Sequence, residues 1–218
     1  MTGRIVYVPG IGADHRAFSR LKTAPDQPQV YADWLSLEST DESFETYCKR
    51  LVDHYKITNE DTLIGLSFGG LVVQQIAKVH GNKQVILVSS FRNRSDLKVL
   101  WTYCLKFKLY RLVPAFQLPL LAEVASAFLH SWRRKESKIL REMLKDANFK
   151  LIRWSLKQIA LIDLKSTYHR RYLSLIGDKD LLIRTWCSDE MIIPDGAHFM
   201  IYTKAEAISG KINAYLQD

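Results

Sequence analysis

The chain has 218 residues, of which 47% are hydrophobic and 25% charged, and its formal net charge is +8 at pH 7. This composition predicts one compact globular domain with a sizeable core, and the sequence has no internal repeat and no low-complexity tract, which excludes a repeat protein or a low-complexity chain. The three cysteines, Cys48, Cys104 and Cys187, lack metal-ligand spacing, so we expect buried thiols and no metal site. The first residues lead into a strand-like stretch without an apolar signal segment, so we expect a cytoplasmic protein.

Short apolar runs alternate with amphipathic segments at both ends of the chain. Strands are predicted near residues 4–8, 28–33, 61–66, 84–89, 171–176 and 190–193. Helices are predicted near residues 14–22, 43–56, 68–80 and 203–216. This alternation predicts an α/β fold, in which a mostly parallel six-stranded sheet is flanked by helices.

Residues 92–170 form a different kind of segment, with helical periodicity and two prolines. Four helices are predicted there, near residues 95–110, 114–130, 136–146 and 148–162. The third would bury Ile139, Leu140, Met143 and Leu144, and the fourth Phe149, Ile152, Leu156 and Ile159. The segment therefore interrupts a core made of residues 1–91 and 171–218.

The positive charge of the chain is concentrated in this middle segment. Residues 92–171 hold 18 Lys and Arg against 6 Asp and Glu, and the remaining chain holds 13 against 17. This charge is explained either by a solvated helix surface or by an anionic substrate or partner. Nucleic acid is not expected, because no binding motif is present. A transmembrane segment is not expected here either, because the longest uncharged run of this middle segment, Leu112 to Ala122, has 11 residues and a span needs about 20.

Ser67 lies in Gly65-Leu66-Ser67-Phe68-Gly69, between a predicted strand and a predicted helix. A serine nucleophile on a sharp strand-to-helix turn needs small residues around it, because the neighbouring backbone crowds the turn. The alternative is a loop serine that caps the helix. The flanking segments favour the nucleophile.

A base and an acid follow Ser67 in the order that a serine nucleophile requires. Asp180 and His198 each come just after a predicted strand, so all three residues are expected at the carboxyl edge of one sheet. The backbone N–H groups of Ile11 and Phe68 are candidates for an oxyanion hole. For Ile11 the alternative is an ordinary strand-to-helix loop.

The chain resembles the α/β-hydrolase superfamily, and most closely its small bacterial serine hydrolases with a Pro-Gly-x-Gly-Ala-Asp loop. The matching segments are Pro9–Asp14, Gly65–Gly69, Gly177–Asp180 and Gly196–Met200. The resemblance implies strand order 2-1-3-4-5-6, a helical cap over the site formed by residues 92–170, and Asp180 rather than Asp178 as the acid. The sheet is reduced, because the superfamily's first antiparallel strands are missing. His198 lies only 18 positions after Asp180, so the intervening helix is expected to be short or absent.

Aromatic side chains in the predicted cap are candidates for lining a substrate pocket. They are Trp101, Tyr103, Phe107 and Phe116. Packing within the cap explains each of them equally well, and the aromatic, aliphatic and cationic residues of 97–114 also suit an interfacial membrane helix.

The sequence thus predicts a serine hydrolase that cleaves a carboxylic ester or thioester through an acyl-enzyme, without a cofactor. The alternatives are a thioesterase acting on acyl-CoA or acyl carrier protein, a lyase or cofactor-free oxygenase on the same fold, and a binding protein with a relic site. The expected partner is a small acyl ester or thioester, with anionic ones among the candidates. The sequence indicates neither the physiological substrate nor the oligomeric state.

Overall fold

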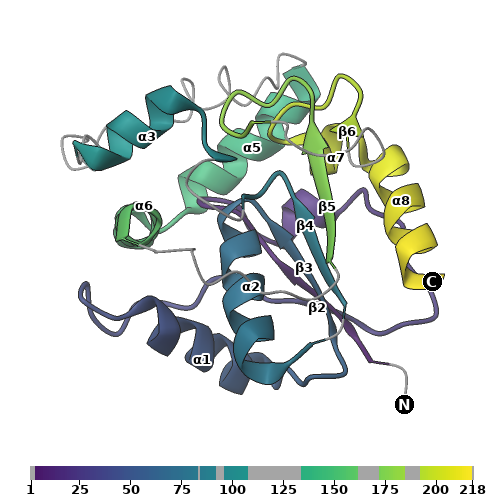
Figure 1. Ribbon diagram of the computed structural model, residues 1–218, viewed down its shortest axis with the longest axis horizontal. Helices are drawn as coiled ribbons and strands as arrows, with labels where there is room; N and C mark the ends of the chain where they lie inside the picture. The colour runs from purple at the N-terminus through teal and green to yellow at the C-terminus, as the bar shows by residue number, and fades with distance from the viewer. Residues whose placement is uncertain are drawn as a thin grey trace.

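A parallel sheet of six strands forms the centre of the computed structural model (Figure 1). The structure describes residues 3–82, 84–91, 96–107, 134–161, 172–184 and 192–217. The strands are β1 (Ile5–Val8), β2 (Gln29–Tyr31), β3 (Thr62–Leu66), β4 (Val85–Val88), β5 (Tyr172–Gly177) and β6 (Ile192–Ile193). Their spatial order is β2-β1-β3-β4-β5-β6, and each neighbouring pair is parallel. The predicted fold class and strand order are both confirmed.

Helices cover both faces of this sheet. They are η1 (His15–Phe18), α1 (Phe44–Tyr55), α2 (Phe68–His80), α3 (Val99–Lys106), α5 (Arg134–Asp146), α6 (Phe149–Leu161), α7 (Met200–Thr203) and α8 (Ala205–Gln217). In Figure 1, α1 and α2 lie to one side of the strands and α8 to the other. Because side chains alternate along a strand, Val6 and Val8 pack with the α1–α2 cluster, whereas Ile5 and Tyr7 pack with the α8 cluster.

The ends of α1 and α2 follow the capping residues seen in the sequence. The Ser43 side chain accepts the Thr46 N–H at the start of α1. At the end of α2, Gly81 adopts φ 76°, a left-handed conformation that glycine reaches without a Cβ penalty.

The helix predicted over 14–22 is wrong, because only the 3-10 turn η1 forms there. Beyond this turn, two backbone groups bond to α8: Lys22 N–H donates to Ser209 Oγ, and Ala24 N–H donates to Asn213 Oδ1. Tertiary hydrogen bonds therefore replace the intrahelical ones that periodicity alone predicted.

Three helices of the middle segment are described: α3, α5 and α6. They lie in the upper and left part of Figure 1, where α3 contacts α6, and α5 contacts η1. The predicted helix 114–130 lies outside the described residues, and the domain limits at 92 and 170 stay a prediction. On α5, Leu140 and Met143 are buried as predicted.

The buried face of α6 differs from the predicted one. It consists of Leu151, Trp154, Ser155, Gln158 and Ile159. Only Ile159 belongs to the predicted set, because the buried face includes the polar Ser155 and Gln158, and Gln158 approaches the Glu42 carbonyl. An apolar pattern cannot reveal such a face.

Candidate active site

Ser67 occupies a strained turn between β3 and α2. Its backbone has φ 52° and ψ −118°, which a non-glycine residue rarely adopts. A Cβ on Gly65 would lie 2.5 Å from the Gly70 backbone, and one on Gly69 would lie 2.2 Å from the Val8 carbonyl oxygen. The glycines are therefore required by the tight approach of helix and strands, which presents the Ser67 side chain at the carboxyl edge of the sheet.

His198 joins Ser67 to Asp180 in one chain of hydrogen bonds. Its Nε2 lies 2.9 Å from Ser67 Oγ, and its Nδ1 lies 2.8 Å from Asp180 Oδ2. His198 and Asp180 are buried, at 7% and 1% exposure, whereas Ser67 is half-buried. The three candidate residues therefore come together, and of the three, Ser67 is the one that is most accessible to solvent.

The carboxylate of Asp180 is held by its own loop as well as by His198. Its Oδ1 accepts the N–H groups of Leu182 and Ile183, at 2.8 and 3.1 Å. Burial alone would raise the pKa of Asp180. The attraction of His198, its hydrogen bond and the two backbone N–H groups outweigh burial, and the pKa is lowered below its ordinary value. Asp180 is therefore charged at neutral pH.

The first strand-to-helix loop lies directly against Ser67. A Cβ on Gly10 would be 3.2 Å from the Ser67 Cβ, and the Gly10 carbonyl accepts the indole N–H of Trp34 at 3.0 Å. Ile11 follows Gly10, and Phe68 opens α2, where N–H groups lack intrahelical partners. These positions are compatible with the predicted oxyanion donors, whose role stays a prediction.

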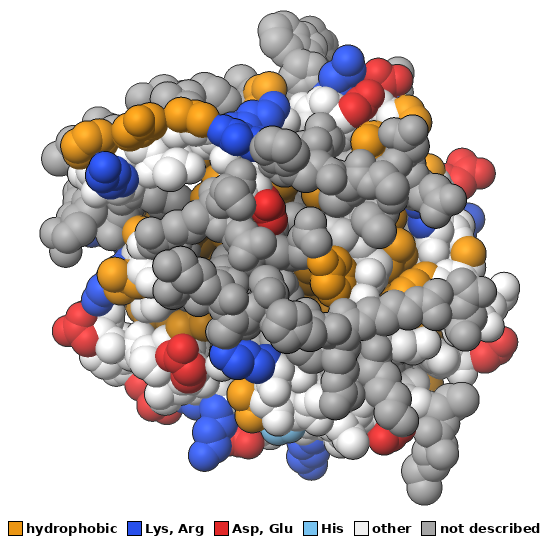
Figure 2. Space-filling model, viewed as in Figure 1, with side chains coloured by type: hydrophobic (Ala, Val, Ile, Leu, Met, Phe, Trp, Pro, Cys, Tyr) orange, Lys and Arg blue, Asp and Glu red, His pale blue; other side chains and the backbone are white. Residues whose placement is uncertain are grey.

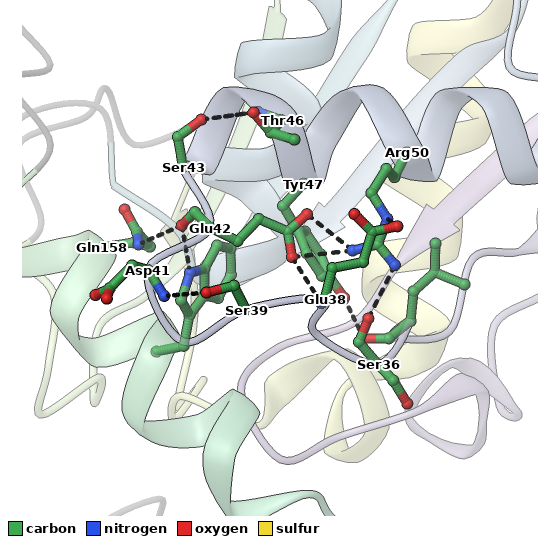
Figure 3. Close-up of polar contacts among 12 residues, drawn as sticks. Ser36, Glu38, Ser39, Asp41, Glu42, Ser43, Thr46, Tyr47, Arg50 and Gln158 are labelled. Carbon is green, nitrogen blue, oxygen red and sulfur yellow. Dashed lines mark hydrogen bonds and ion pairs between the residues drawn. The ribbon is translucent and has the colours of Figure 1, made fainter.

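A hydrogen-bonded junction ties α6 to the segment before α1 (Figure 3). The Trp154 indole N–H donates to the Glu42 carbonyl at 2.8 Å, and Gln158 Nε2 approaches the same oxygen at 3.5 Å. The Glu42 side chain is in turn bound by Arg50, at 2.8 and 2.9 Å. The Trp154 ring also stands perpendicular to Phe68, with centroids 6.1 Å apart, so α6 packs directly against the residue that follows Ser67.

A cavity of about 190 Å³ lies between the first loop and helices α5 and α6. Its lining residues are Gly12, Ala13, Asp14, Asp33, Trp34, Leu35, Ser36, Met143, Asp146, Ala147, Asn148, Leu151 and Ile152. Three of them are carboxylates: Asp14 and Asp146 each lie 2.6 Å from Arg16, and Asp33 lies 2.7 Å from the His15 ring. The cavity therefore begins next to the first strand-to-helix loop, which contains Gly10 and is called the Gly10 loop below, and it has a partly apolar, partly acidic wall.

Of the aromatic residues predicted to line a substrate pocket, the three that the structure describes do not line this cavity. Tyr103 and Phe107 are 52% and 65% exposed, and the Trp101 indole donates to the Leu181 carbonyl. Phe116 lies outside the described residues. Their role in substrate binding stays a prediction.

Trp34 and Trp154 both contact the candidate site, although neither was predicted from the sequence. Trp34 bonds to the Gly10 loop, and its ring packs on Phe68 with centroids 5.7 Å apart. Large aromatics in a loop and on an amphipathic helix were the available signal, but neither has a motif around it. Their partners are distant backbone carbonyls, which sequence patterns do not identify.

Other kinds of site are not found in the part of the chain that the structure describes. In it, no cluster of three or more His, Cys, Asp or Glu side chains is arranged to hold a metal ion. Of the helices within the same ranges, none is long and apolar enough to cross a membrane. Cys48 is buried, which raises the pKa of its thiol well above the ordinary value.

The fold and the candidate site together define an α/β-hydrolase-fold protein. The thermophilic esterase of Thermogutta terrifontis is 16% identical with a TM-score of 0.77, covering 99% of this chain and 91% of that one. The enol-lactonase of Burkholderia xenovorans LB400 is 16% identical with a TM-score of 0.76, over 100% and 92%. A bromoperoxidase of Bacillus anthracis is 16% identical with a TM-score of 0.73, over 100% and 93%.

These likenesses show the fold. No protein-family model matches the sequence. No curated protein sequence matches it either. The structural likenesses, rather than a sequence match, confirm the resemblance read from the sequence, and they confirm it at the level of the α/β-hydrolase fold.

Proposed function

We propose that this protein is a serine hydrolase that cleaves a carboxylic ester or thioester through an acyl-enzyme. The observation that carries the proposal is the uninterrupted chain Ser67 Oγ–His198 Nε2 and His198 Nδ1–Asp180 Oδ2, at 2.9 and 2.8 Å. Nucleophile, base and orienting acid are the parts that acyl transfer needs, and hydrogen-bond distance between them is the geometric criterion.

Each residue then has one role in the mechanism. His198 Nε2 takes the Ser67 Oγ proton as Oγ attacks the substrate carbonyl, and the charged Asp180 stabilises the imidazolium. The N–H groups of Ile11 and Phe68 stabilise the oxyanion, and the loss of one such donor typically costs about 3 kcal/mol in the barrier. His198 returns the proton to the leaving alcohol or thiol, and then activates the water that hydrolyses the acyl-enzyme.

The cavity beside the Gly10 loop is the proposed binding site for one part of the substrate. Its carboxylates Asp14 and Asp146 pair with Arg16, and Asp33 is hydrogen-bonded to the His15 ring, so this wall gives no support to an anionic substrate. Neutral acyl esters and lactones are therefore the first substrates to assay. The choice also fits the esterase and enol-lactonase that share the fold.

Intact-mass analysis after treatment with a fluorophosphonate tests the proposal. We expect one adduct on the wild type and on Ser39→Ala, an exposed loop serine, and none on Ser67→Ala. Circular dichroism confirms that each variant is folded. An unlabelled, folded wild type without esterase or thioesterase activity would contradict the hydrolase and favour a lyase or cofactor-free oxygenase on this fold.

A further inference from the structure

An exposed apolar row runs along α3. Val99 and Tyr103 in α3 and Phe107 directly after it are 52%, 52% and 65% exposed. Their spacing of four residues, together with the Phe107 N–H that donates to the Tyr103 carbonyl, places them on one helical face. The rings of Tyr103 and Phe107 stack, with centroids 6.2 Å apart and planes at 13°. Figure 2 shows hydrophobic side chains in a row at the upper left, where Figure 1 places α3. Contiguous exposed apolar surface of this kind marks an interaction site.

The start of α3 is fixed to the loop that carries Asp180. Lys98 N–H donates to the Leu182 carbonyl at 2.9 Å, and the Trp101 indole N–H donates to the Leu181 carbonyl at 3.2 Å. An antiparallel bridge between Leu97 and Ile183 adds to this attachment. Because Trp101 is directed toward the Leu181 carbonyl of the Asp180 loop, the row lies on the roughly opposite face of α3, where its side chains are exposed.

Positive charge accompanies the row. Lys106 is exposed and, at 100° per residue, lies within about 20° of Val99 around the helix axis, about two turns further along the same face. Figure 2 shows Lys or Arg side chains near both ends of the row. The segment 92–171 that contains α3 has 18 basic residues against 6 acidic ones. The surface thus combines aromatic and aliphatic groups with cations, which is the chemistry that an anionic lipid surface complements.

We propose that α3 docks on the surface of an anionic phospholipid bilayer. Val99, Tyr103 and Phe107 enter the boundary between headgroups and acyl chains, and Lys106 lies at the level of the lipid phosphates. The helix lies in the plane of the surface, because its eight residues are far too few to span the bilayer. Docking of this kind is independent of the proposed hydrolysis, and it brings the Asp180 loop close to the lipid.

Sedimentation with vesicles tests the docking on the full-length protein. One set of vesicles contains phosphatidylglycerol and phosphatidylcholine in equal amounts, and the other contains phosphatidylcholine alone. We expect the wild type to partition preferentially to the anionic vesicles. The double variant Tyr103→Ser/Phe107→Ser should lower the partition coefficient at least about tenfold, and Lys106→Glu about tenfold.

Matched control variants separate docking from general surface effects. Val79→Ser removes a 68% exposed apolar side chain from α2, and Lys49→Glu reverses an exposed charge on α1; both should partition like the wild type. Equal binding to both kinds of vesicle, or wild-type binding by Tyr103→Ser/Phe107→Ser, would overturn the proposal. A dimer that this double variant dissociates would also overturn it, because a second copy would then cover the row.

Discussion

Asp180 holds His198 with one carboxylate oxygen, while its other oxygen is held by its own loop. Oδ2 lies 2.8 Å from His198 Nδ1, and Oδ1 accepts two backbone N–H groups. The carboxylate therefore has a fixed orientation, and it fixes the imidazole tautomer in which Nδ1 carries the proton and Nε2 faces Ser67 as an acceptor.

Replacing Asp180 with asparagine tests this arrangement. Asp180→Asn can present an amide N–H to Nδ1, which favours the wrong tautomer, so we expect kcat for a p-nitrophenyl ester to fall by about three to four orders of magnitude. Asp178→Asn is the matched control, since Asp178 is exposed two residues away, and its kcat should stay within about twofold. The reverse ranking of the two variants would show that Asp178 is the acid.

The parts of the site that sequence predicted are those dictated by backbone sterics and strand order. The glycines around Ser67 indicated a crowded turn, and short apolar runs before Asp180 and His198 placed both residues at the carboxyl edge of the sheet. These features depend on residues that are close together in the sequence, so they can be predicted from it. The choice of Asp180 over Asp178 rested on family resemblance, and the structure adds that Asp180 is the one hydrogen-bonded to His198.

Adding a methyl group at Gly69, next to the turn that carries Ser67, should destabilise the fold. In Gly69→Ala the new Cβ would meet the Val8 and Pro9 carbonyl oxygens at 2.2 and 2.4 Å, and backbone atoms of a central strand cannot move aside. We expect urea denaturation to show that the free energy of unfolding falls by at least about 3 kcal/mol.

Gly210→Ala is the opposite case and serves as its control. Gly210 lies in α8, and a Cβ added there would meet no atom within 4 Å apart from the adjoining residues and backbone of its own helix, so alanine should raise the free energy of unfolding by about 0.5–1 kcal/mol. Equal effects of the two substitutions would mean that the close approach of Gly69 to β1 is not present in solution.

Contacts between distant segments were the parts that sequence could not predict. Lys22 and Ala24 bond to α8 rather than within a helix, and α6 buries Gln158 and Trp154, whose side chains donate to the Glu42 carbonyl. A buried carbonyl without a hydrogen bond costs free energy, so the side chains that donate to it are buried even when they are polar. Periodicity reports apolar faces, and it therefore assigned the wrong face to α6.

Asp61 should make the stability of the protein depend on acid pH. Its carboxylate binds the Arg4 side chain, at 2.8 and 3.2 Å, and accepts the N–H groups of Arg4 and Thr58. Burial alone would raise the pKa of Asp61, but these hydrogen bonds and the Arg4 charge lower it below the ordinary value. The charged form therefore stabilises the fold above the unfolded-state pKa of about 3.9, and this contribution is lost as the pH falls through the lower folded-state pKa.

Asp61→Asn measures that contribution. At pH 7 we expect a loss of about 2 kcal/mol in urea denaturation, because the charge-assisted hydrogen bonds are weakened. The difference from the wild type should be constant above about pH 5 and should shrink below about pH 4. Asp53→Asn, on the exposed surface of α1, should follow the wild type at every pH. A difference that stays constant down to about pH 3 would contradict the role of the Asp61 charge.

Trp154 should contribute more to the attachment of α6 than the ion pair beside it. Trp154→Phe removes the indole N–H that reaches the Glu42 carbonyl at 2.8 Å and leaves a smaller ring against Tyr47 and Phe68. We expect thermal denaturation to show that the free energy of unfolding falls by about 2–3 kcal/mol. Lys157→Ala, on the same helix, breaks only the exposed contact with Asp41, so its melting temperature should match the wild type. The opposite ranking would mean that surface charge, rather than the buried indole, holds α6 to the core.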